Sequence, residues 1–393
     1  MGKIFIVSAT IAGLALSIYY LTRRKDEPKG IEQLIGNTPL IKINSLSRAT
    51  GCTILAKAEF MNVGGSSKDR VALAVIEDAE KKGLIKPNTG STIFEGTVGS
   101  TGISLAIISR AKGYKCHIVM PDDVAQEKSN LLLMLGATVE KVKPCSIVDP
   151  NHFVNLARKR AEEMNSSNSD AHGLFCNQFE NLVNFDIHYR TTGPEIYKQT
   201  GGKIDAFVMG AGTGKHRIKQ GGTIGGVSAY LKSRLENIKV VLADPQGSGL
   251  YNKIRYNLMY TSHEAEGTRK RHQIDTIVEG VGINRLTANF AKAIEYIDDA
   301  VKVTDEEAVG MSRYLVNNDG LFVGSSSSVN CVAAVKLARK LGPGHTIVTL
   351  LCDSGSRHLT KFWSDEFLQK VGIEAPTEGL DFIKQASPVD TSV

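Results

Sequence analysis

A lysine stands at the start of an expected helix, in the stretch NVGGSSKDRVALAV that covers residues 62–75. Glycines and serines precede Lys68, and an apolar run with helical spacing follows it. The positive end of a helix dipole opposes a nearby cation, so this position lowers the pKa of the lysine and favours the neutral amine that forms Schiff bases. Taken alone, the pattern is also that of an ordinary surface lysine.

Two further stretches could bind anions. EGTVGSTGISLA, residues 95–106, places the hydroxyls of Thr97, Ser100 and Thr101 at a turn into a helix, which suits a carboxylate. The same residues are also common helix N-caps. GAGTGKHRIKQGGTIGG, residues 210–226, follows an apolar strand-like run and resembles a phosphate loop.

The glycine-rich stretch 210–226 fits neither of the two common nucleotide-binding motifs. A Walker loop needs Ser or Thr where His216 stands, and a dinucleotide fingerprint needs glycine where Lys215 stands. One lysine and several anion cradles together suit an amino-acid substrate on a phosphorylated aldehyde cofactor.

Strand-like and helix-like segments alternate from Ile31 onward, which predicts a parallel α/β fold. Strand-like runs cover 53–60, 91–96, 115–121, 204–210, 238–245 and 345–353, and helix-like runs cover 69–83 and 101–113. The chemistry-bearing stretches follow strand ends, where open α/β sheets bind ligands. The last fifteen or so residues are predicted to be a loose tail.

Composition excludes several classes of protein. The net charge of +6 is mild for 393 residues, and the basic clusters at 215–220 and 268–273 lack interleaved aromatics, so we expect solvated loops and no nucleic-acid partner. The six cysteines show no metal-ligand spacing, which indicates reduced thiols in a cytosol-like compartment and no metal site.

The N-terminus differs from the rest of the chain. Residues 4–21 carry no charge and span roughly 27 Å as a helix, about the thickness of a thin bilayer. Arg23, Arg24 and Lys25 outweigh the single Lys3, which predicts a membrane anchor with the remaining chain in the cytosol. A signal peptide is the alternative, although no clear small-residue cleavage site follows the apolar run.

The order of the motifs resembles the cysteine synthase/cystathionine β-synthase family of fold-type II enzymes, which use pyridoxal 5′-phosphate (PLP). The resemblance covers roughly residues 31–375. It rests on IGNTPLIKI (35–43), SSKDR (66–70), EGTVGSTG (95–102), NQFENLVNFDIHYRTTGPEI (177–196), the interrupted GTG and GT pair (212–223), GVG (280–282) and CDSGSRHLTKF (352–362). With its anchor, the chain is most similar to fungal members of the mitochondrial outer membrane, with the endoplasmic reticulum as the alternative.

The resemblance implies a role for each site residue. Lys68 would hold PLP by a Schiff base and act as the catalytic base, and Ser354 would face the pyridine nitrogen unless a one-residue slip puts Asp353 there. The residues implied to bind the cofactor are Lys68, Ser100, Gly212, Thr213, Gly214, Gly222, Thr223 and Ser354, and those implied to bind substrate are Thr97, Thr101 and Gln178.

The chain departs from the family pattern at three places. Residues 215–221 are inserted within the phosphate cup, where they either loop out or deform it. Val98 replaces a hydroxyl, and Ser100 replaces a longer asparagine that contacts the cofactor ring. Residues 324–329 lose a glycine. A lost polar contact in a buried site costs on the order of 1–3 kcal/mol, which can change substrate preference.

The leading hypothesis is therefore β-replacement, which forms L-cysteine from O-acetylserine and sulfide. Cystathionine-type synthesis or β-elimination is the alternative, and a membrane-tethered scaffold without catalysis is the second alternative. We expect an anchor and linker (1–27), a catalytic domain (28–375) with a smaller subdomain at about 62–175, and a tail (376–393). The resemblance also implies two open parallel-sheet subdomains with the cofactor between them, and a homodimer.

Overall fold

The structure is a computed structural model that describes residues 30–124, 126–167, 169–178, 180–212, 221–259, 276–282, 286–374 and 379–384. The predicted anchor, the predicted site residues Thr213 and Gly214, and both basic clusters lie outside these residues. Among the helices in the described ranges, none combines the length and the apolar character needed to cross a membrane.

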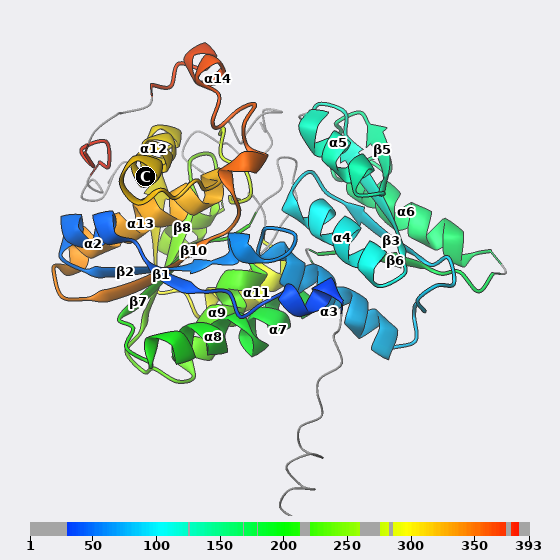
Figure 1. The fold of residues 1–393 in the computed structure, drawn as a ribbon, viewed down its shortest axis with the longest axis horizontal. Coiled ribbons are helices and arrows are strands. Elements are labelled where there is room, and N and C mark those ends of the chain that lie inside the picture. The colour runs from blue at the N-terminus through cyan, green and yellow to red at the C-terminus, as the bar shows by residue number, and fades with distance from the viewer. Residues whose placement is uncertain are drawn as a thin grey trace, which may run out of the picture.

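A six-stranded sheet forms the larger part of the fold (Figure 1), with the order β1-β2-β10-β7-β8-β9. Its strands are β1 (Leu40–Lys42), β2 (Thr53–Ala58), β7 (Ala206–Gly210), β8 (Lys239–Pro245), β9 (Asp299–Val303) and β10 (Thr346–Leu351). Neighbours run parallel except β1, which runs antiparallel to β2. The connection from β1 to β2 is shorter than the dozen or more residues that a parallel crossover needs, and this explains the exception.

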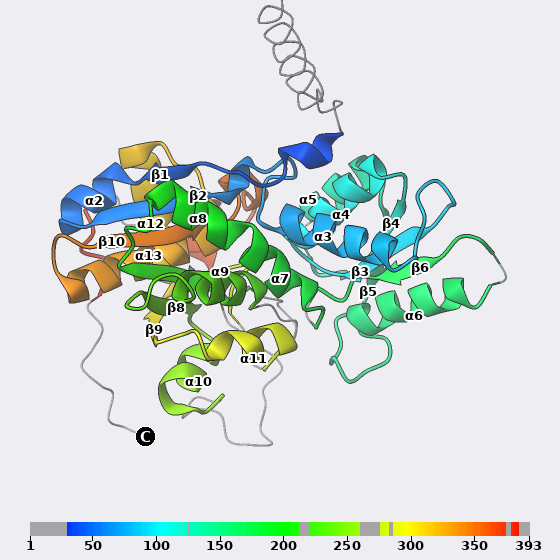
Figure 2. The same cartoon turned by 90° about the horizontal axis from the view of Figure 1, so that it is seen from below.

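Helices cover both faces of this sheet (Figures 1 and 2). On one side lie α2 (Asn44–Thr50), α12 (Asp305–Asp319) and α13 (Ser325–Leu341), and on the other lie α7 (Val183–Arg190), α8 (Thr192–Thr200), α9 (Gly222–Lys232) and α11 (Ala288–Ile294). The remaining helices of this part in the described ranges are α10 (Leu250–Tyr256), α14 (Asp365–Lys370) and the 3-10 turns η2 (Glu59–Met61) and η3 (Gly355–Arg357). Because both faces are covered, β7 is buried along its whole length.

A four-stranded parallel sheet, in the order β5-β4-β3-β6, forms the smaller part. Its strands are β3 (Thr92–Gly96), β4 (Lys115–Pro121), β5 (Thr138–Val142) and β6 (Gly173–Phe175). Helices α3 (Lys68–Lys81), α4 (Ser100–Ala111) and α5 (Gln126–Met134) lie on one side, and α6 (Phe153–Asn165) lies on the other (Figure 2). The first 3-10 turn, η1 (Ile31–Leu34), contacts α4 of this smaller part. The two-sheet α/β architecture expected from the sequence is confirmed, and these strands fall inside the segment predicted as the smaller subdomain.

Parallel strands from both sheets end at the same region. Strands β2 and β10 lead towards Lys68 and Cys352, β7 leads to Gly212, and β3 of the other sheet leads to Thr97. Ligands in α/β folds bind at the carboxyl ends of strands. The two sheets therefore direct the chemistry-bearing segments towards a shared site.

Candidate active site

A cavity of about 1340 Å³, measured with its opening to solvent, lies between the two sheets. From the smaller part, its wall contains residues 97–101, 121, 123, 124 and 128. From the larger part, it contains residues from 209–212, 221–224, 276–281 and 352–353. The structure brings together the predicted site residues Lys68, Thr97, Ser100, Thr101, Gln178, Gly212, Gly222 and Thr223 in this wall. Ser354 does not line the cavity.

Lys68 is the first residue of α3 and lines the cavity. Burial lowers the pKa of its amine, and the nearby Cys352 and Asp353 only partly offset this effect. Its ammonium group makes no hydrogen bond or ion pair within the described part of the chain. Lys68 is thus a cavity lysine rather than a surface lysine, and its neutral, nucleophilic form is present at lower pH than in an exposed lysine.

The predicted carboxylate cradle lies at the start of α4. Gly99 is the N-cap residue, and no side chain of the described residues caps this helix, so the hydroxyls around it do not serve as N-caps. Thr101 donates its hydroxyl hydrogen to Oε1 of Gln178 at 2.5 Å, and both residues line the cavity. This contact brings two of the predicted substrate-binding side chains together.

The first turn of α9 forms another part of the wall. Gly221 is its N-cap residue, and the helix start has no capping side chain among the described residues. An added Cβ at Gly222 would lie 2.3 Å from Oδ1 of Asn184, so a glycine is needed for α9 to pack this closely on α7. The positive end of α9 therefore faces the cavity and favours an anion.

Comparison with known proteins places this geometry in a family. Residues 31–353 match the model of the family described as "Pyridoxal-phosphate dependent enzyme". The chain belongs to the pyridoxal-phosphate-dependent enzyme family. "Cysteine synthase 2" of Neurospora crassa is 60% identical over 357 residues, which cover 90% of this chain and 76% of that protein.

Two further comparisons agree with this assignment. A Saccharomyces cerevisiae protein whose name contains the words "mitochondrial cysteine synthase" is 52% identical over 367 residues, 92% of each chain. The crystal structure of O-ureido-L-serine synthase superposes with a TM-score of 0.71 at 28% identity, covering 87% of this chain and 98% of that chain. The expected family and its cofactor are confirmed.

The residues of the cavity fit pyridoxal phosphate. Lys68 offers an amine with a lowered pKa for the aldehyde, and the N-terminus of α9 at Gly222 and Thr223 offers backbone N–H groups and a positive dipole for the phosphate. Thr223 also places its hydroxyl 3.0 Å from Nε2 of His188. His188 is fully buried, and burial holds its pKa well below the ordinary value, so it supports Thr223 as a neutral ring.

Asp353, rather than Ser354, lines the cavity of this pyridoxal-phosphate-dependent enzyme. Its Oδ2 accepts a hydrogen bond from Ser100 at 3.1 Å and lies 3.3 Å from Nε2 of His358. Burial raises the pKa of Asp353, but His358, Arg357 and the hydrogen bond from Ser100 together outweigh this effect, and the net pKa is below its ordinary value. The side chain of Ser354 instead accepts from the backbone N–H of Ser356, outside the cavity lining.

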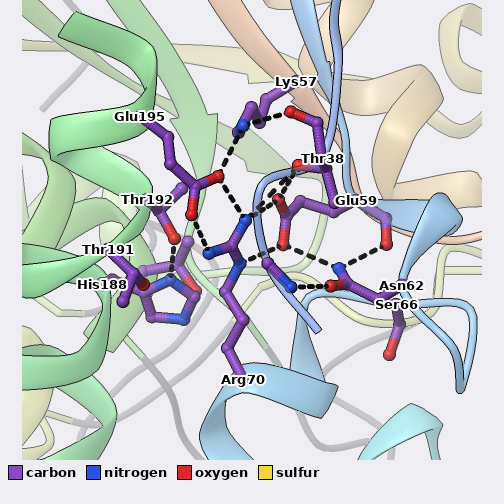
Figure 3. A network of polar contacts seen from close by, with 12 residues as sticks. Thr38, Lys57, Glu59, Asn62, Ser66, Arg70, His188, Thr191, Thr192 and Glu195 are labelled. Atoms are coloured by element: carbon purple, nitrogen blue, oxygen red, sulfur yellow. Dashed lines mark hydrogen bonds and ion pairs between the residues drawn. The ribbon is translucent and has the colours of Figure 1, made fainter. Parts of the chain in front are cut away.

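A buried network of charges supports the segment that carries Lys68 (Figure 3). Arg70 donates to both carboxylate oxygens of Glu59, at 2.9 and 2.8 Å, and to both of Glu195, at 2.6 and 2.8 Å. Lys57 also contacts Glu195, at 2.7 Å, and Thr38 donates to Glu59 at 2.7 Å. The network fixes α3 to η2 and α8, two residues beyond Lys68.

Sequence reasoning missed four residues in or behind the cavity wall: Lys128, His188, Glu279 and His358. His188 lies within the quoted stretch 177–196, four residues before Thr192, whose hydroxyl is 2.9 Å from its Nδ1. The four-residue spacing of His188 and Thr192, typical of contacts on one helix face, was the signal in the sequence that could have indicated His188. Lys128 and Glu279 are 151 residues apart, and nothing local indicates their contact.

Glu95, at the end of β3, gives a pH-dependent contribution to stability. Burial raises its pKa to about 8, although the backbone N–H groups of Gln178 and Gly96 oppose the shift. Because the folded protein holds this proton more tightly than the unfolded chain, its stabilising contribution is complete below the unfolded pKa and is lost as pH rises towards 8.

We expect Glu95→Gln to remove this dependence. Between pH 5 and 8 the wild-type free energy of unfolding should fall relative to the variant by at most about 1.4 kcal/mol per pH unit. Urea unfolding at several pH values measures it, with the exposed Glu162→Gln as the control. Parallel pH curves for wild type and Glu95→Gln would contradict the assignment.

Proposed function

We propose that this enzyme forms L-cysteine by β-replacement, joining the sulfur of sulfide to the β-carbon of an activated serine such as O-acetylserine. The β–oxygen bond breaks and acetate leaves, the carbon–sulfur bond forms, and the α-proton is removed and then returned. The observation that carries the proposal is the half-buried amine of Lys68, which has no polar partner among the described residues and lies in a cavity also lined by Thr101 and Gln178. The names of the relatives at 60% and 52% identity support the same reaction.

Each residue has a task in this proposal. Bound pyridoxal phosphate supplies an electron sink for the substrate α-carbon. Nζ of Lys68 holds the cofactor and then takes the α-proton, for which its lowered pKa suits it. Thr97, Thr101 and Gln178 bind the substrate carboxylate, and the start of α9 at Gly222 holds the phosphate.

The remaining predicted cofactor contacts are part of the same proposal. Gly212, Thr213 and Gly214 would complete the phosphate cup, and Ser100 would contact the cofactor. Between Ser354 and Asp353 as the partner of the ring nitrogen, Asp353 is favoured because it lines the cavity. The cavity and family membership also favour an enzyme over a tethered scaffold.

The direct test supplies purified full-length protein with O-acetylserine and sulfide and measures cysteine over time. Cysteine as the main product supports the proposal. Little cysteine, together with efficient cystathionine formation from serine and homocysteine, would overturn it.

Gln178→Leu tests the carboxylate cradle. We expect the KM for the amino-acid substrate to rise roughly 5- to 150-fold, the equivalent of a lost polar contact of about 1–3 kcal/mol, with a smaller change in kcat. Steady-state kinetics over a range of O-acetylserine concentrations measure this split. The exposed Gln33→Leu is the control, and an unchanged KM in Gln178→Leu would remove this residue from the substrate site.

We also propose that residues 1–27 anchor the enzyme in the mitochondrial outer membrane, with the catalytic domain in the cytosol and the chain as a homodimer. The uncharged run 4–21 with its basic flank supports the anchor, and the name of the Saccharomyces cerevisiae relative supports mitochondria. A fluorescent fusion of residues 1–27, combined with protease treatment of intact mitochondria, tests location and orientation. A reticular pattern would instead favour the endoplasmic reticulum.

A further inference from the structure

An ion pair crosses from one part of the fold to the other in the cavity wall. Lys128 belongs to α5 beside the smaller sheet, and Glu279 belongs to the loop 276–282 of the larger part. Their side chains are only 14% and 27% exposed, and both residues line the cavity. Burial raises the pKa of Glu279, but Lys128, His358 and Lys361 together outweigh this effect, so the carboxylate is charged at neutral pH.

Neighbouring contacts hold both ends of this pair in place. The backbone N–H of Glu279 donates to Oγ of Ser325 at 2.9 Å, and the same hydroxyl donates back to the Glu279 carbonyl at 3.1 Å. On the other side, Glu127 accepts a hydrogen bond from Thr360 at 2.8 Å. The start of α5 is thereby fixed to the larger part at two adjacent residues.

The ion pair separates two cavities. A second, much smaller cavity, about 220 Å³ when measured with its opening to solvent, shares part of its lining with the first. Its lining residues are Glu127, Lys128, Ile277, Glu279, Arg357, His358, Thr360, Lys361 and Phe362. Lys128, Glu279 and Lys361 line both cavities. The Lys128–Glu279 contact is therefore part of the partition between them.

The partition continues to the base of the larger cavity. Nδ1 of His358 is 3.6 Å from Glu279, and its Nε2 is 3.3 Å from Asp353. Asp353 accepts a hydrogen bond from Ser100, which belongs to α4 in the smaller part of the fold. These contacts form a continuous row of polar side chains from Lys128 to Ser100.

We infer that the Lys128–Glu279 ion pair limits the size of the second substrate, so that a sulfide-sized nucleophile enters and an amino-acid thiol is excluded. This inference rests on the proposed function and names a substrate class for it. Sulfide brings one heavy atom, whereas homocysteine must also place an amino group and a carboxylate. With the ion pair formed, the smaller cavity is too small for these two groups, so they need the space that the Lys128 side chain occupies.

The smaller cavity has suitable charges for such a head group. Glu127 and Arg357 both line it, and Nη1 of Arg357 is buried without a hydrogen-bond partner among the described residues. Removing the Lys128 side chain joins this space to the catalytic cavity. The enlarged cavity then offers an acidic and a basic group to a zwitterion.

Lys128→Ala, Lys128→Arg and Lys112→Ala test the inference in the full-length holoenzyme. Lys112 pairs with Glu80 at 3.1 Å with similar exposure, 20% and 24%, but lines neither cavity, so it is a matched control. We expect the ratio of kcat/KM for homocysteine to that for sulfide to rise roughly tenfold or more in Lys128→Ala. Lys128→Arg and Lys112→Ala should keep the wild-type ratio.

A second readout does not depend on cysteine synthesis. Hydroxylamine and its bulkier O-benzyl derivative both react with the enzyme-bound cofactor, and the loss of its visible absorbance gives the two rates. The O-benzyl rate relative to the hydroxylamine rate should rise in Lys128→Ala alone. If the ratio in Lys128→Ala stays within twofold of the wild-type ratio, the inference is overturned, whether or not the enzyme makes cysteine. A raised ratio supports the inference, and it does so even if the wild type forms no cysteine and the proposed function fails.

Discussion

Lys68→Ala is expected to abolish cysteine formation, with a loss on the order of 10²–10⁴-fold from proton transfer alone. Lys68 lines the cavity, as Asp353 does, and burial lowers the pKa of its amine, so the variant loses the amine best suited to hold the cofactor and accept the proton. Cysteine production from O-acetylserine and sulfide measures the loss. Borohydride reduction of the wild type should also fix the cofactor on the peptide that contains Lys68, as mass spectrometry would show.

Lys82→Ala is the control for this prediction. Lys82 lies at the C-terminal end of α3, where its side chain is 60% exposed and that of its partner Asp78 is 34% exposed. It should keep wild-type activity and cofactor content. Activity of Lys68→Ala within tenfold of wild type, or reduction at another lysine, would show that a different residue holds the cofactor.

Arg70→Met is expected to lower the free energy of unfolding by about 3–5 kcal/mol, because removing one partner of a buried ion pair leaves charge without compensation. Glu59 is fully buried and receives two hydrogen bonds from Arg70. Among the cations of the described residues, Glu195 would retain only Lys57. Urea unfolding followed by far-ultraviolet circular dichroism measures the change. Because Arg70 is two residues from Lys68, the variant should also lose cofactor at lower urea concentrations.

The exposed pair of Lys82 and Asp78 provides the reference for the expected loss of stability. Lys82→Ala breaks a contact between solvent-exposed charges, which is worth at most about 1 kcal/mol. Arg70→Lys keeps the charge but not the two paired contacts, so its loss should lie between those of Lys82→Ala and Arg70→Met. A loss for Arg70→Met below 1 kcal/mol would mean that the network in Figure 3 contributes little to stability.

Local patterns predicted much of the fold and the site. Glycines, hydroxyls and a lysine at strand ends indicated the segments around Lys68, Thr97 and Gly222, because parallel strands bring their carboxyl ends together. The antiparallel β1 was not anticipated, since its direction follows from the length of the connection rather than from its composition.

Contacts between distant segments could not be predicted in the same way. Arg70 and Glu195 are 125 residues apart, and Lys128 and Glu279 are 151 apart, so neither pair leaves a local signature. Whether Ser354 or Asp353 faces the cavity depends on a turn of one residue after β10. The sequence alone left both open.

The contact between Ser100 and Asp353 joins residues 253 positions apart, and it has a consequence for the order in which the protein is synthesised. The segment carrying Lys68 leaves the ribosome early, whereas β10 and Asp353 are among the last parts of the catalytic fold to emerge. A nascent chain or a C-terminally truncated product that lacks residue 353 therefore lacks one wall of the cavity. We therefore expect such a chain to lack cysteine-forming activity even though it already carries Lys68.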